Sequence, residues 1–362
     1  MQKLNILVLS HLTTNVSSGP NWSVPASVKS LSEIDNVLWI NKTDAEMPHW
    51  NKVSAYHNIK EFDSLDKLPF PFEHPDIVVF EGFYFIDDAI YALKLKQKGI
   101  PYIIVPRGSL TLQALHNEAK IKKAIAHFLI FDRFVNGAIA IQYLTKKERE
   151  DSTCRFLKDS FVVPNGFDEP MKKKELFSEN QFKSVFVGRL SIYHKGIDNL
   201  LKAINNIKEQ LRNAAFTLNM YGPCRKYDFD AVGDMINEYD ISDIVFLNDS
   251  ISGETKERTL LDADLFVLTS RMEGHPMGLI EALAYGLPCF VSSGSNMKEE
   301  IEKFNAGWTC NGEVADIQEA LLKVIKEKTQ LRRKSEGAKQ LALNYKWDNI
   351  SMQFHEEIKK LI

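Results

Sequence analysis

The sequence has little that would place it in a membrane or direct it out of the cell. Its longest uninterrupted apolar run, Ala89 to Leu93, has five residues, whereas a helix that spans a bilayer needs about 20. The run Ile6 to Leu9 is too short for the core of a secretory signal, which takes roughly 7 to 15 residues. We therefore expect no membrane-spanning segment, and we predict that the first run is a buried strand.

Cysteine is scarce, and so is any excess of positive charge. The four cysteines in 362 residues are far apart, and no Cys-x-x-Cys pair or histidine cluster has the spacing of a zinc site. This pattern favours a reduced, cytoplasmic setting. The 45 Lys and Arg residues against 48 Asp and Glu leave a net charge of -3, which argues against a protein held mainly on nucleic-acid phosphates. No nucleic-acid partner is expected.

Short apolar runs alternate with longer stretches of helical periodicity along the whole chain. The runs are apolar on both faces, which is typical of parallel strands covered by helices. The alternation stops in a polar, charged stretch after Asp168 and then restarts. The sequence therefore predicts an α/β fold of two Rossmann-like domains with parallel sheets facing across a cleft. The predicted divisions are a first domain at 1–168, a linker at 169–182 and a second domain at 183–342.

The first candidate site is a loop of the second domain that carries two cations. Arg189 follows the predicted strand Val185 to Val187, Lys195 comes six residues later, and each has a glycine beside it. Open α/β sheets bind ligands beyond the carboxyl ends of their strands. Arginine can bind two phosphate oxygens at once, and lysine adds a point charge. The pattern predicts an anion site, although two side chains that merely face solvent would produce the same pattern.

Two glutamates, Glu273 and Glu281, mark a second candidate site after the predicted strand Leu265 to Leu268. Pro276 and the nearby glycines predict a turn between Glu273 and a helix that begins near Met277. Both carboxylates can then face one ligand. Free N–H groups at the start of the helix would receive a phosphate, and carboxylates accept hydrogen bonds from sugar hydroxyls. The alternative is that Glu273 only complements the helix dipole.

With these motifs the sequence resembles the family 4 glycosyltransferases, which have the GT-B fold. The resemblance implies a retaining, metal-independent hexosyltransferase that moves a sugar from a UDP- or GDP-sugar to a saccharide or lipid-linked saccharide, as in polysaccharide or glycoconjugate biosynthesis. It also implies that residues 343–362 return as a helix to the first domain. The motifs stand in family order over almost the whole chain: Val163 to Asp168, Gly188 to Leu190, Lys195 with Gly196, Tyr221 to Pro223, Ala263 to Leu268, and the pair Glu273 and Glu281.

The resemblance also implies roles for single residues. It places Arg189 and Lys195 on the diphosphate. It places Glu281 on the ribose and Glu273 on the transferred sugar, so that the predicted catalytic residues are Arg189, Lys195 and Glu273. Further donor-binding candidates are Gly19, in an expected loop from Gly19 to Trp22 whose backbone can approach the phosphates, and Ser250 and Ile251 near the base. Gly278 is another donor-binding candidate, followed by Leu279 and Ile280, whose backbone faces the phosphates.

The sequence departs from the commonest family pattern at two places. Many relatives have Phe or Leu where His275 stands, and many have a histidine in a loop of the first domain that has no counterpart here. In one subgroup a Pro-Arg-Gly loop replaces that histidine, and the loop Pro106 to Leu110 resembles it. Arg107, Ser109 and His275 are therefore candidates for the acceptor site or the reaction centre, with a packed, neutral imidazole as the alternative for His275.

Neither a metal nor another cofactor is expected, because the nucleotide sugar is a co-substrate. Arg189, Lys195 and the start of the helix can stabilise the negative charge on a departing nucleoside diphosphate. Two Asp-x-Asp triplets, at 228–230 and 262–264, are of the kind that binds a metal in other glycosyltransferases. However, the first lies in a polar segment and the second immediately precedes a buried strand.

One stretch of the first domain bears on the acceptor and on location. Basic residues share one side of a predicted helix there, and apolar residues share another. Such a helix can rest on an anionic membrane surface, which predicts peripheral contact at the inner face of the membrane and a lipid-linked acceptor. An ordinary domain helix that buries its apolar side is an equal alternative. The basic residues are Lys120, Lys123 and His127, and the apolar ones are Ile121, Ile125, Phe128 and Leu129.

Two other functions stay open on the sequence alone. One is a nucleotide-sugar epimerase or phosphorylase of the same fold, and the other is a non-catalytic nucleotide-sugar-binding protein. A dinucleotide-dependent dehydrogenase is disfavoured, because no Gly-x-Gly-x-x-Gly motif follows the strand Leu4 to Leu9.

Overall fold

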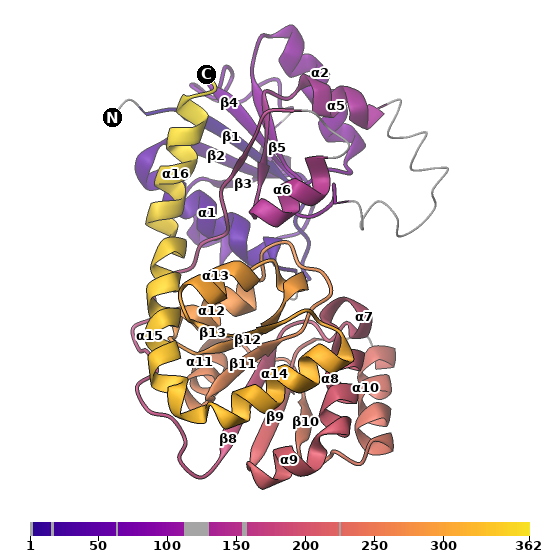
Figure 1. Cartoon of the computed structure of the whole chain (residues 1–362). Helices are drawn as coiled ribbons and strands as arrows, with labels where there is room; N and C mark the ends of the chain where they lie inside the picture. Colours follow the sequence, from indigo (N-terminus) through magenta and orange to yellow (C-terminus); the bar gives the residue numbers. More distant parts are fainter. Residues whose placement is uncertain (1–2, 16–17, 63, 112–129, 154–157, 224–225) are drawn as a thin grey trace. The chain divides into compact units, whose positions relative to one another are not determined.

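The computed structural model describes residues 3–15, 18–62, 64–111, 130–153, 158–223 and 226–362. The chain forms two compact units, which we describe one at a time (Figure 1). Unit 1 comprises residues 1–166 and 347–362, and unit 2 comprises residues 167–346. Each unit has its own parallel sheet with helices, which confirms the predicted α/β class with two Rossmann-like domains. In the described part of the chain, no helix combines the length and the apolar character needed to span a membrane.

Unit 1 is built on a seven-stranded sheet in the order β3-β2-β1-β4-β5-β6-β7, and its strand pairs are parallel. Successive side chains of a strand point to opposite faces. Accordingly, Ile6 and Val8 lie in one buried apolar cluster, and Leu7 and Leu9 lie in another. The strands are β1 (Asn5–Ser10), β2 (Asn36–Asn41), β3 (Tyr56–Asn58), β4 (Ile77–Glu81), β5 (Tyr102–Val105), β6 (Ala140–Tyr143) and β7 (Ser160–Val162).

The last helix of the chain, α16 (Trp347–Lys359), belongs to unit 1. It packs against α1 (Pro20–Ile34), and Trp347 and Phe354 join the same buried cluster as Ile6. Nδ1 of His355 lies 2.8 Å from Oδ2 of Asp35, with both side chains fully buried. The other helices in the described part of unit 1 are α2 (Ile86–Gln97), α5 (Asp132–Gly137) and α6 (Lys146–Thr153), with 3-10 turns η1 (Trp50–Lys52) and η2 (Ile59–Glu61).

Unit 2 has a six-stranded parallel sheet in the order β10-β9-β8-β11-β12-β13. The chain runs outward from β8 to β10 and then crosses to β11 on the other side of β8. The strands are β8 (Phe182–Val187), β9 (Phe216–Tyr221), β10 (Val245–Asn248), β11 (Leu265–Leu268), β12 (Cys289–Ser292) and β13 (Gly307–Cys310). The stretch 169–182, expected to be a linker, lies in unit 2. The side chain of Lys174 is buried there, and its Nζ lies 3.6 Å from Oδ1 of Asp264.

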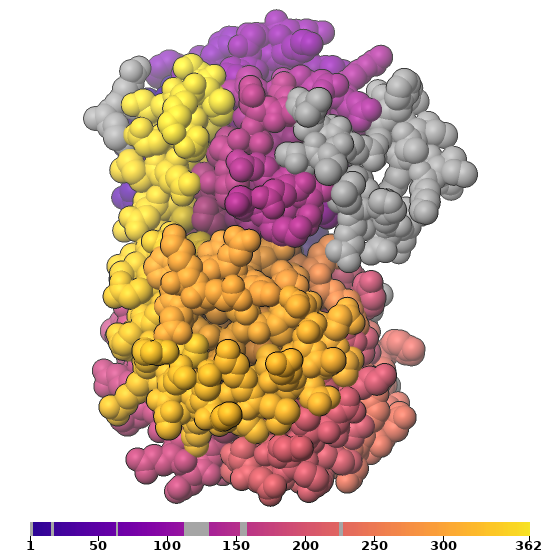
Figure 2. All heavy atoms as spheres, in the orientation of Figure 1, coloured from indigo at the N-terminus to yellow at the C-terminus, as the bar shows by residue number. Residues whose placement is uncertain are grey.

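Helices cover the sheet of unit 2, and Figure 2 shows one face closed by side chains of the orange and yellow segment that includes α14. The helices are α7 (Ile192–Lys195), α8 (Ile197–Asn206), α9 (Lys208–Asn213), α10 (Lys226–Glu238), α11 (Gly253–Asp262), α12 (Met277–Ala284), α13 (Lys298–Lys303), α14 (Val314–Lys326) and α15 (Leu331–Ala342). The described residues of the unit also form 3-10 turns: η4 (Ser293–Ser295), η5 (Lys328–Gln330) and η6 (Leu343–Tyr345).

Candidate active site

The candidate site of unit 2 lies at the carboxyl ends of β8 and β11. These neighbouring strands flank the point where the strand order reverses, which is where open α/β sheets bind their ligands. Arg189 lies in the loop after β8, and Lys195 ends the short helix α7 that follows. Glu273 lies in the loop after β11, and Glu281 lies in α12. The fold therefore brings both predicted charge motifs to one edge of one sheet.

The loops after β8 and β11 are joined to each other. Gly196 has a left-handed backbone (φ 63°), and a Cβ there would lie 2.2 Å from the carbonyl oxygen of Thr269. Only glycine therefore permits this close approach. The guanidinium of Arg271 donates to both carboxylate oxygens of Asp198, at 2.6 and 2.9 Å. Sequence reasoning missed this pair, and the only signal for Arg271 was its place in the same loop as Glu273.

Lys195 and Glu273 form a largely buried ion pair. Nζ of Lys195 lies 2.5 Å from Oε1 of Glu273, and the side chains are 14% and 12% exposed. The hydroxyl of Ser270 donates to the same oxygen at 2.5 Å. The carboxylate is thus held in one orientation by two donors. An ammonium group carries three N–H donors, so Lys195 can keep this contact and still donate to a ligand oxygen.

The start of α12 has amides available for an anion. The N–H groups of Leu279 and Ile280 donate to the carbonyl oxygen of Pro276, at 3.0 and 3.2 Å. Among the described residues, none accepts a hydrogen bond from the N–H groups of Met277 and Gly278. A helix start with free amides attracts negative charge. The backbone role predicted for Leu279 and Ile280 stays a prediction, and the unpaired amides are those of the two preceding residues.

Glu281 is the more open of the two site glutamates, with 34% of its side chain exposed. Its Oε2 contacts Nζ of Lys256, which comes from α11. Ser250 is exposed and Ile251 is half-buried in the loop between β10 and α11, a few residues before Lys256. Lys256 was not a candidate on the sequence, because no local pattern links it to a residue 25 positions away.

Arg189 differs from the other charged residues of the site. Its side chain is exposed, and within the described parts of the chain its guanidinium has neither an ion pair nor a hydrogen bond. The guanidinium therefore has all five N–H donors available to a ligand. Of the two predicted diphosphate-binding cations, Arg189 is unpaired and Lys195 is shared with Glu273.

His275, two residues before the first residue of α12, is buried, with its ring centroid 5.2 Å from that of Tyr345. Burial lowers the pKa of His275 to about 3. The imidazole is therefore neutral at pH 7. His275 stays a candidate for the reaction centre only as a neutral, packed side chain.

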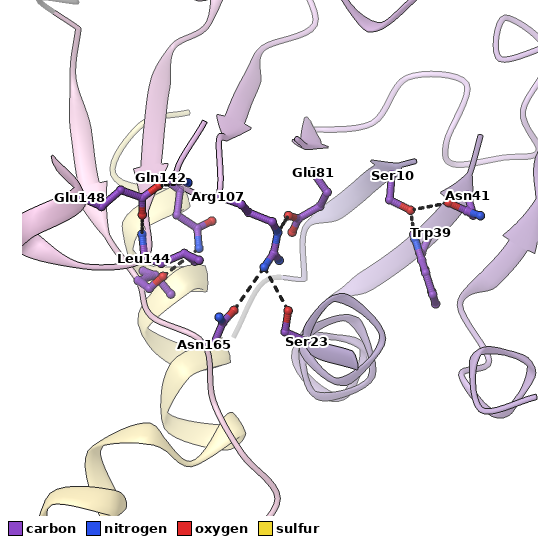
Figure 3. Close-up of polar contacts among 12 residues, drawn as sticks. Ser10, Ser23, Trp39, Asn41, Glu81, Arg107, Gln142, Leu144, Glu148 and Asn165 are labelled. Atoms are coloured by element: carbon purple, nitrogen blue, oxygen red, sulfur yellow. Dashed lines mark hydrogen bonds and ion pairs between the residues drawn. The ribbon is translucent and has the colours of Figure 1, made fainter. Parts of the chain in front are cut away.

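Arg107 of unit 1 is bonded on several sides (Figure 3). Its Nε donates to Oε2 of Glu81 at 2.7 Å, and the two side chains are 12% and 10% exposed. Another guanidinium nitrogen donates to the hydroxyl of Ser23 at 3.0 Å and to the side-chain oxygen of Asn165 at 3.4 Å. These bonds join the end of β4, helix α1 and the segment after β7. They use much of the donor capacity that the proposed reaction-centre role would need.

The residues that follow Arg107 are also held within unit 1. The N–H of Gly108 donates to Oε1 of Glu148 at 2.5 Å, and the N–H of Leu144 donates to Oε2 of Glu148 at 2.8 Å. Burial raises the pKa of Glu148. Ser109 is half-buried, and its N–H donates to the carbonyl oxygen of Pro106 at 3.0 Å. The predicted role of Ser109 in the acceptor site stays a prediction.

Gly19 is exposed and immediately precedes α1. The expectation that Gly19 to Trp22 form a loop is wrong, because Pro20 begins the helix. Proline suits a first helical position, where its missing N–H costs no hydrogen bond. Gly19 has a φ of -52°, and a Cβ there would meet no atom within 4 Å. The backbone at Gly19 therefore does not require glycine.

Several of the residues that could bind a metal have protein partners. Asp264 is buried, and its carboxylate accepts from the N–H groups of Ser178 and Lys183 at 2.9 and 3.0 Å. The triplet 228–230 lies in α10. Of the described residues, His11, Asp87 and Asp88 have metal-like spacing, but Lys42 Nζ lies 2.5 and 2.6 Å from the two carboxylates. The absence of a metal stays a prediction.

The basic and apolar stripe predicted from Lys120 to Leu129 lies outside the described residues. Membrane contact through it therefore stays a prediction as well.

Residues 167–341, nearly all of unit 2, match the family model described as glycosyl transferases group 1. Protein CapJ of Staphylococcus aureus is 23% identical over 281 residues, which cover 75% of this chain and 70% of CapJ. The putative colanic acid biosynthesis glycosyltransferase WcaL of Escherichia coli K12 is 28% identical over 120 residues, or 32% of this chain and 29% of WcaL.

Among solved structures, Anabaena Alr3699/HepE in complex with UDP has a TM-score of 0.75 at 15% identity. The match covers 99% of this chain and 100% of that one. This likeness shows the shared fold. Together, the fold, the family model and the sequence relatives support the conclusion that this chain is a glycosyltransferase of the GT-B fold. It has homologues in polysaccharide biosynthesis.

Proposed function

We propose that this glycosyltransferase takes a sugar from a nucleotide-sugar donor, a UDP- or GDP-sugar, bound by unit 2. It transfers the sugar with retention to a saccharide or lipid-linked saccharide, in polysaccharide or glycoconjugate biosynthesis. The observation that carries the proposal is the arrangement at the ends of β8 and β11: two glutamates held by lysines, and an arginine and two helix amides that have no partner among the described residues. The relation to WcaL and the UDP in the HepE structure support the donor and the pathway class.

The diphosphate is the part of the donor for which this edge of the sheet is best suited. Within the part of the chain that the structure describes, the guanidinium of Arg189 and the N–H groups of Met277 and Gly278 at the helix start have no partner, so they can bind an anion. The negative charge on the diphosphate grows as the bond to the sugar breaks. Groups that bind this charge more strongly in the transition state lower the barrier. We therefore assign Arg189, Lys195 and the start of α12 to the leaving group.

We assign each of the two glutamates to one sugar of the donor. Glu281 is open enough to accept hydrogen bonds from the ribose hydroxyls. Glu273 is held by Lys195 and Ser270, so its carboxylate is oriented before the transferred sugar arrives. An oriented group loses little freedom on binding, which favours a productive geometry. The cations of the loops supply the charge that a divalent metal would otherwise supply, and we propose that the reaction needs no metal.

Incubation with a panel of UDP-, GDP- and ADP-sugars tests the function, with release of nucleoside diphosphate as the readout. A transferase releases the diphosphate, and an added acceptor increases the rate. An epimerase would convert one nucleotide sugar into another with no release, and a binding protein would retain the intact donor. Activity that persists in EDTA would support the metal-independent mechanism. Arg332→Ala serves as a matched control, because it removes an exposed cation from α15.

A further inference from the structure

The contact between Lys256 and Glu281 joins two helices of the candidate donor site. Lys256 lies one turn into α11 and Glu281 lies in α12, and Nζ of the lysine contacts Oε2 of the glutamate. The other oxygen, Oε1, has no partner among the described residues. The carboxylate therefore has one oxygen held by the protein and one oxygen open to a ligand.

Stability does not account for this pair. The side chains of Lys256 and Glu281 are 25% and 34% exposed, and ion pairs of such exposure contribute little to folding because solvent screens them. A contact of this kind has a clearer effect on conformation. A free glutamate side chain samples several rotamers, whereas one that is held by a cation presents its open oxygen in a narrower range of directions.

The place of α11 connects the pair to the rest of the donor. Its first residue, Gly253, follows closely on Ser250 and Ile251, the residues predicted near the base. Lys256 therefore extends from α11, the helix that follows the loop predicted near the base, to the carboxylate of Glu281, which we propose binds the ribose.

We infer that Lys256 is a positioning residue, which holds Glu281 so that its free oxygen accepts a hydrogen bond from the ribose diol. This inference rests on the proposed function. It makes the site selective for ribonucleoside diphosphates over analogues that lack the sugar hydroxyls. A site built to bind a hydroxyl discriminates strongly against an analogue without it, because its polar group is then left unpaired.

Isothermal titration of the full chain with UDP, GDP and ADP identifies the nucleotide that binds most tightly. That nucleotide and its 2′,3′-dideoxy analogue are then titrated into wild type and four variants: Lys256→Met, Lys256→Arg, Glu281→Gln and Lys256→Met with Glu281→Gln. Methionine keeps the length and apolar stem of lysine but removes its charge. Lys202→Met, on the exposed side of α8, is the matched control. Thermal melts verify that each variant is folded.

We expect Lys256→Met to weaken binding of the ribonucleotide by roughly tenfold, about the effect of one well-oriented hydrogen bond to a charged group. Binding of the dideoxy analogue should change by less than about twofold, because it has no hydroxyl for Glu281 to accept from. Lys256→Arg should restore most of the affinity. In the Glu281→Gln background, Lys256→Met should have no further effect, because the positioned charge is already gone.

Two results overturn the inference while the proposed function stands: unchanged ribonucleotide affinity in Lys256→Met, or an equal loss for the ribonucleotide and its dideoxy analogue. The second would mean that Lys256 acts only through its charge on the diphosphate. If folded wild type binds none of the three nucleotides, the proposed donor site itself is wrong, and the inference fails with it.

Discussion

Arg107 in unit 1 and Arg189 in unit 2 occupy equivalent places, because each follows the last residue of a buried parallel strand by two positions. Their surroundings are opposite. Arg107 is 12% exposed and is bonded to Glu81, Ser23 and Asn165. Arg189 is exposed, and its guanidinium has no partner in the described part of the chain. An arginine at the end of a strand is therefore available to a ligand only where the neighbouring strands leave it unpaired.

The neighbouring strand explains the difference. In unit 1, β5 pairs with β4, and Val105 lies beside Glu81, so a carboxylate stands next to the residues that follow β5. In unit 2, β8 pairs with β9, and Val187 lies beside Tyr221, which Gly222 follows. No carboxylate occupies the equivalent position. The same residue type thus stabilises one unit and is left open for an anion in the other.

The largest effect on this comparison should come from Arg107→Ala. It leaves the largely buried Glu81 without its cation, and breaking such a pair costs about 3 to 5 kcal/mol. We expect the free energy of unfolding, measured with urea, to fall by about that amount. Adding Glu81→Gln should recover part of the loss. A variant of unchanged stability but greatly reduced turnover would instead place Arg107 in the reaction centre.

Arg189→Ala should have the opposite profile. We expect kcat for nucleotide release to fall roughly 100 to 1,000-fold, because one cation is lost from the leaving group. The free energy of unfolding should change by less than about 0.5 kcal/mol, since the exposed side chain has no hydrogen bond or ion pair with the described residues. The control Arg332→Ala should alter neither quantity. If Arg189→Ala turned over near the wild-type rate, Arg189 would not be part of the site, and its proposed difference from Arg107 would be contradicted.

Glu281→Ala should weaken donor binding by about 1.5 to 3 kcal/mol, the range for a lost hydrogen bond to a charged group. Calorimetric titration with the donor measures the loss. Glu254→Ala, at the exposed start of α11, is a control with the same change of charge. Glu281 and Glu81 can then be compared directly. Loss of the Glu281 carboxylate should affect donor affinity, whereas loss of the Glu81 carboxylate should affect folding. Equal affinity in folded Glu281→Ala would contradict the assignment.

The smallest effect, taken per pH unit, should be the pH dependence caused by His275. Burial holds its pKa at about 3 in the folded chain, against an ordinary value of 6.5. Between these pH values the unfolded chain binds a proton that the folded chain does not. The free energy of unfolding should therefore fall below pH 6.5, by about 1.4 kcal/mol per pH unit.

Urea unfolding of wild type and His275→Phe at pH 7, 6 and 5 measures this contribution as the difference in slope. Both proteins should behave alike above pH 6.5, and wild type should lose more stability below it. Parallel curves would mean that the imidazole titrates as it does in water, and His275 would then belong with the open groups of the site rather than with the interior.

The sequence alone determined the α/β class, the strand runs and the position of the charged motifs at strand ends. These features depend on local patterns: apolar runs form buried strands, and proline and glycine mark turns. One local expectation was wrong, since Gly19 to Trp22 were expected in a loop although Pro20 begins α1. Proline is compatible with both a turn and a first helical turn, so its presence did not distinguish them.

Only the tertiary structure decided which charged residues are satisfied. Arg107 meets Ser23 across 84 positions and Glu81 across 26, and Lys256 meets Glu281 across 25. No local pattern encodes such contacts, because they depend on the order of strands in the sheet and on the register between them. The charge of an arginine is set by its chemistry, but its availability to a ligand is set by the neighbours that the fold places around it.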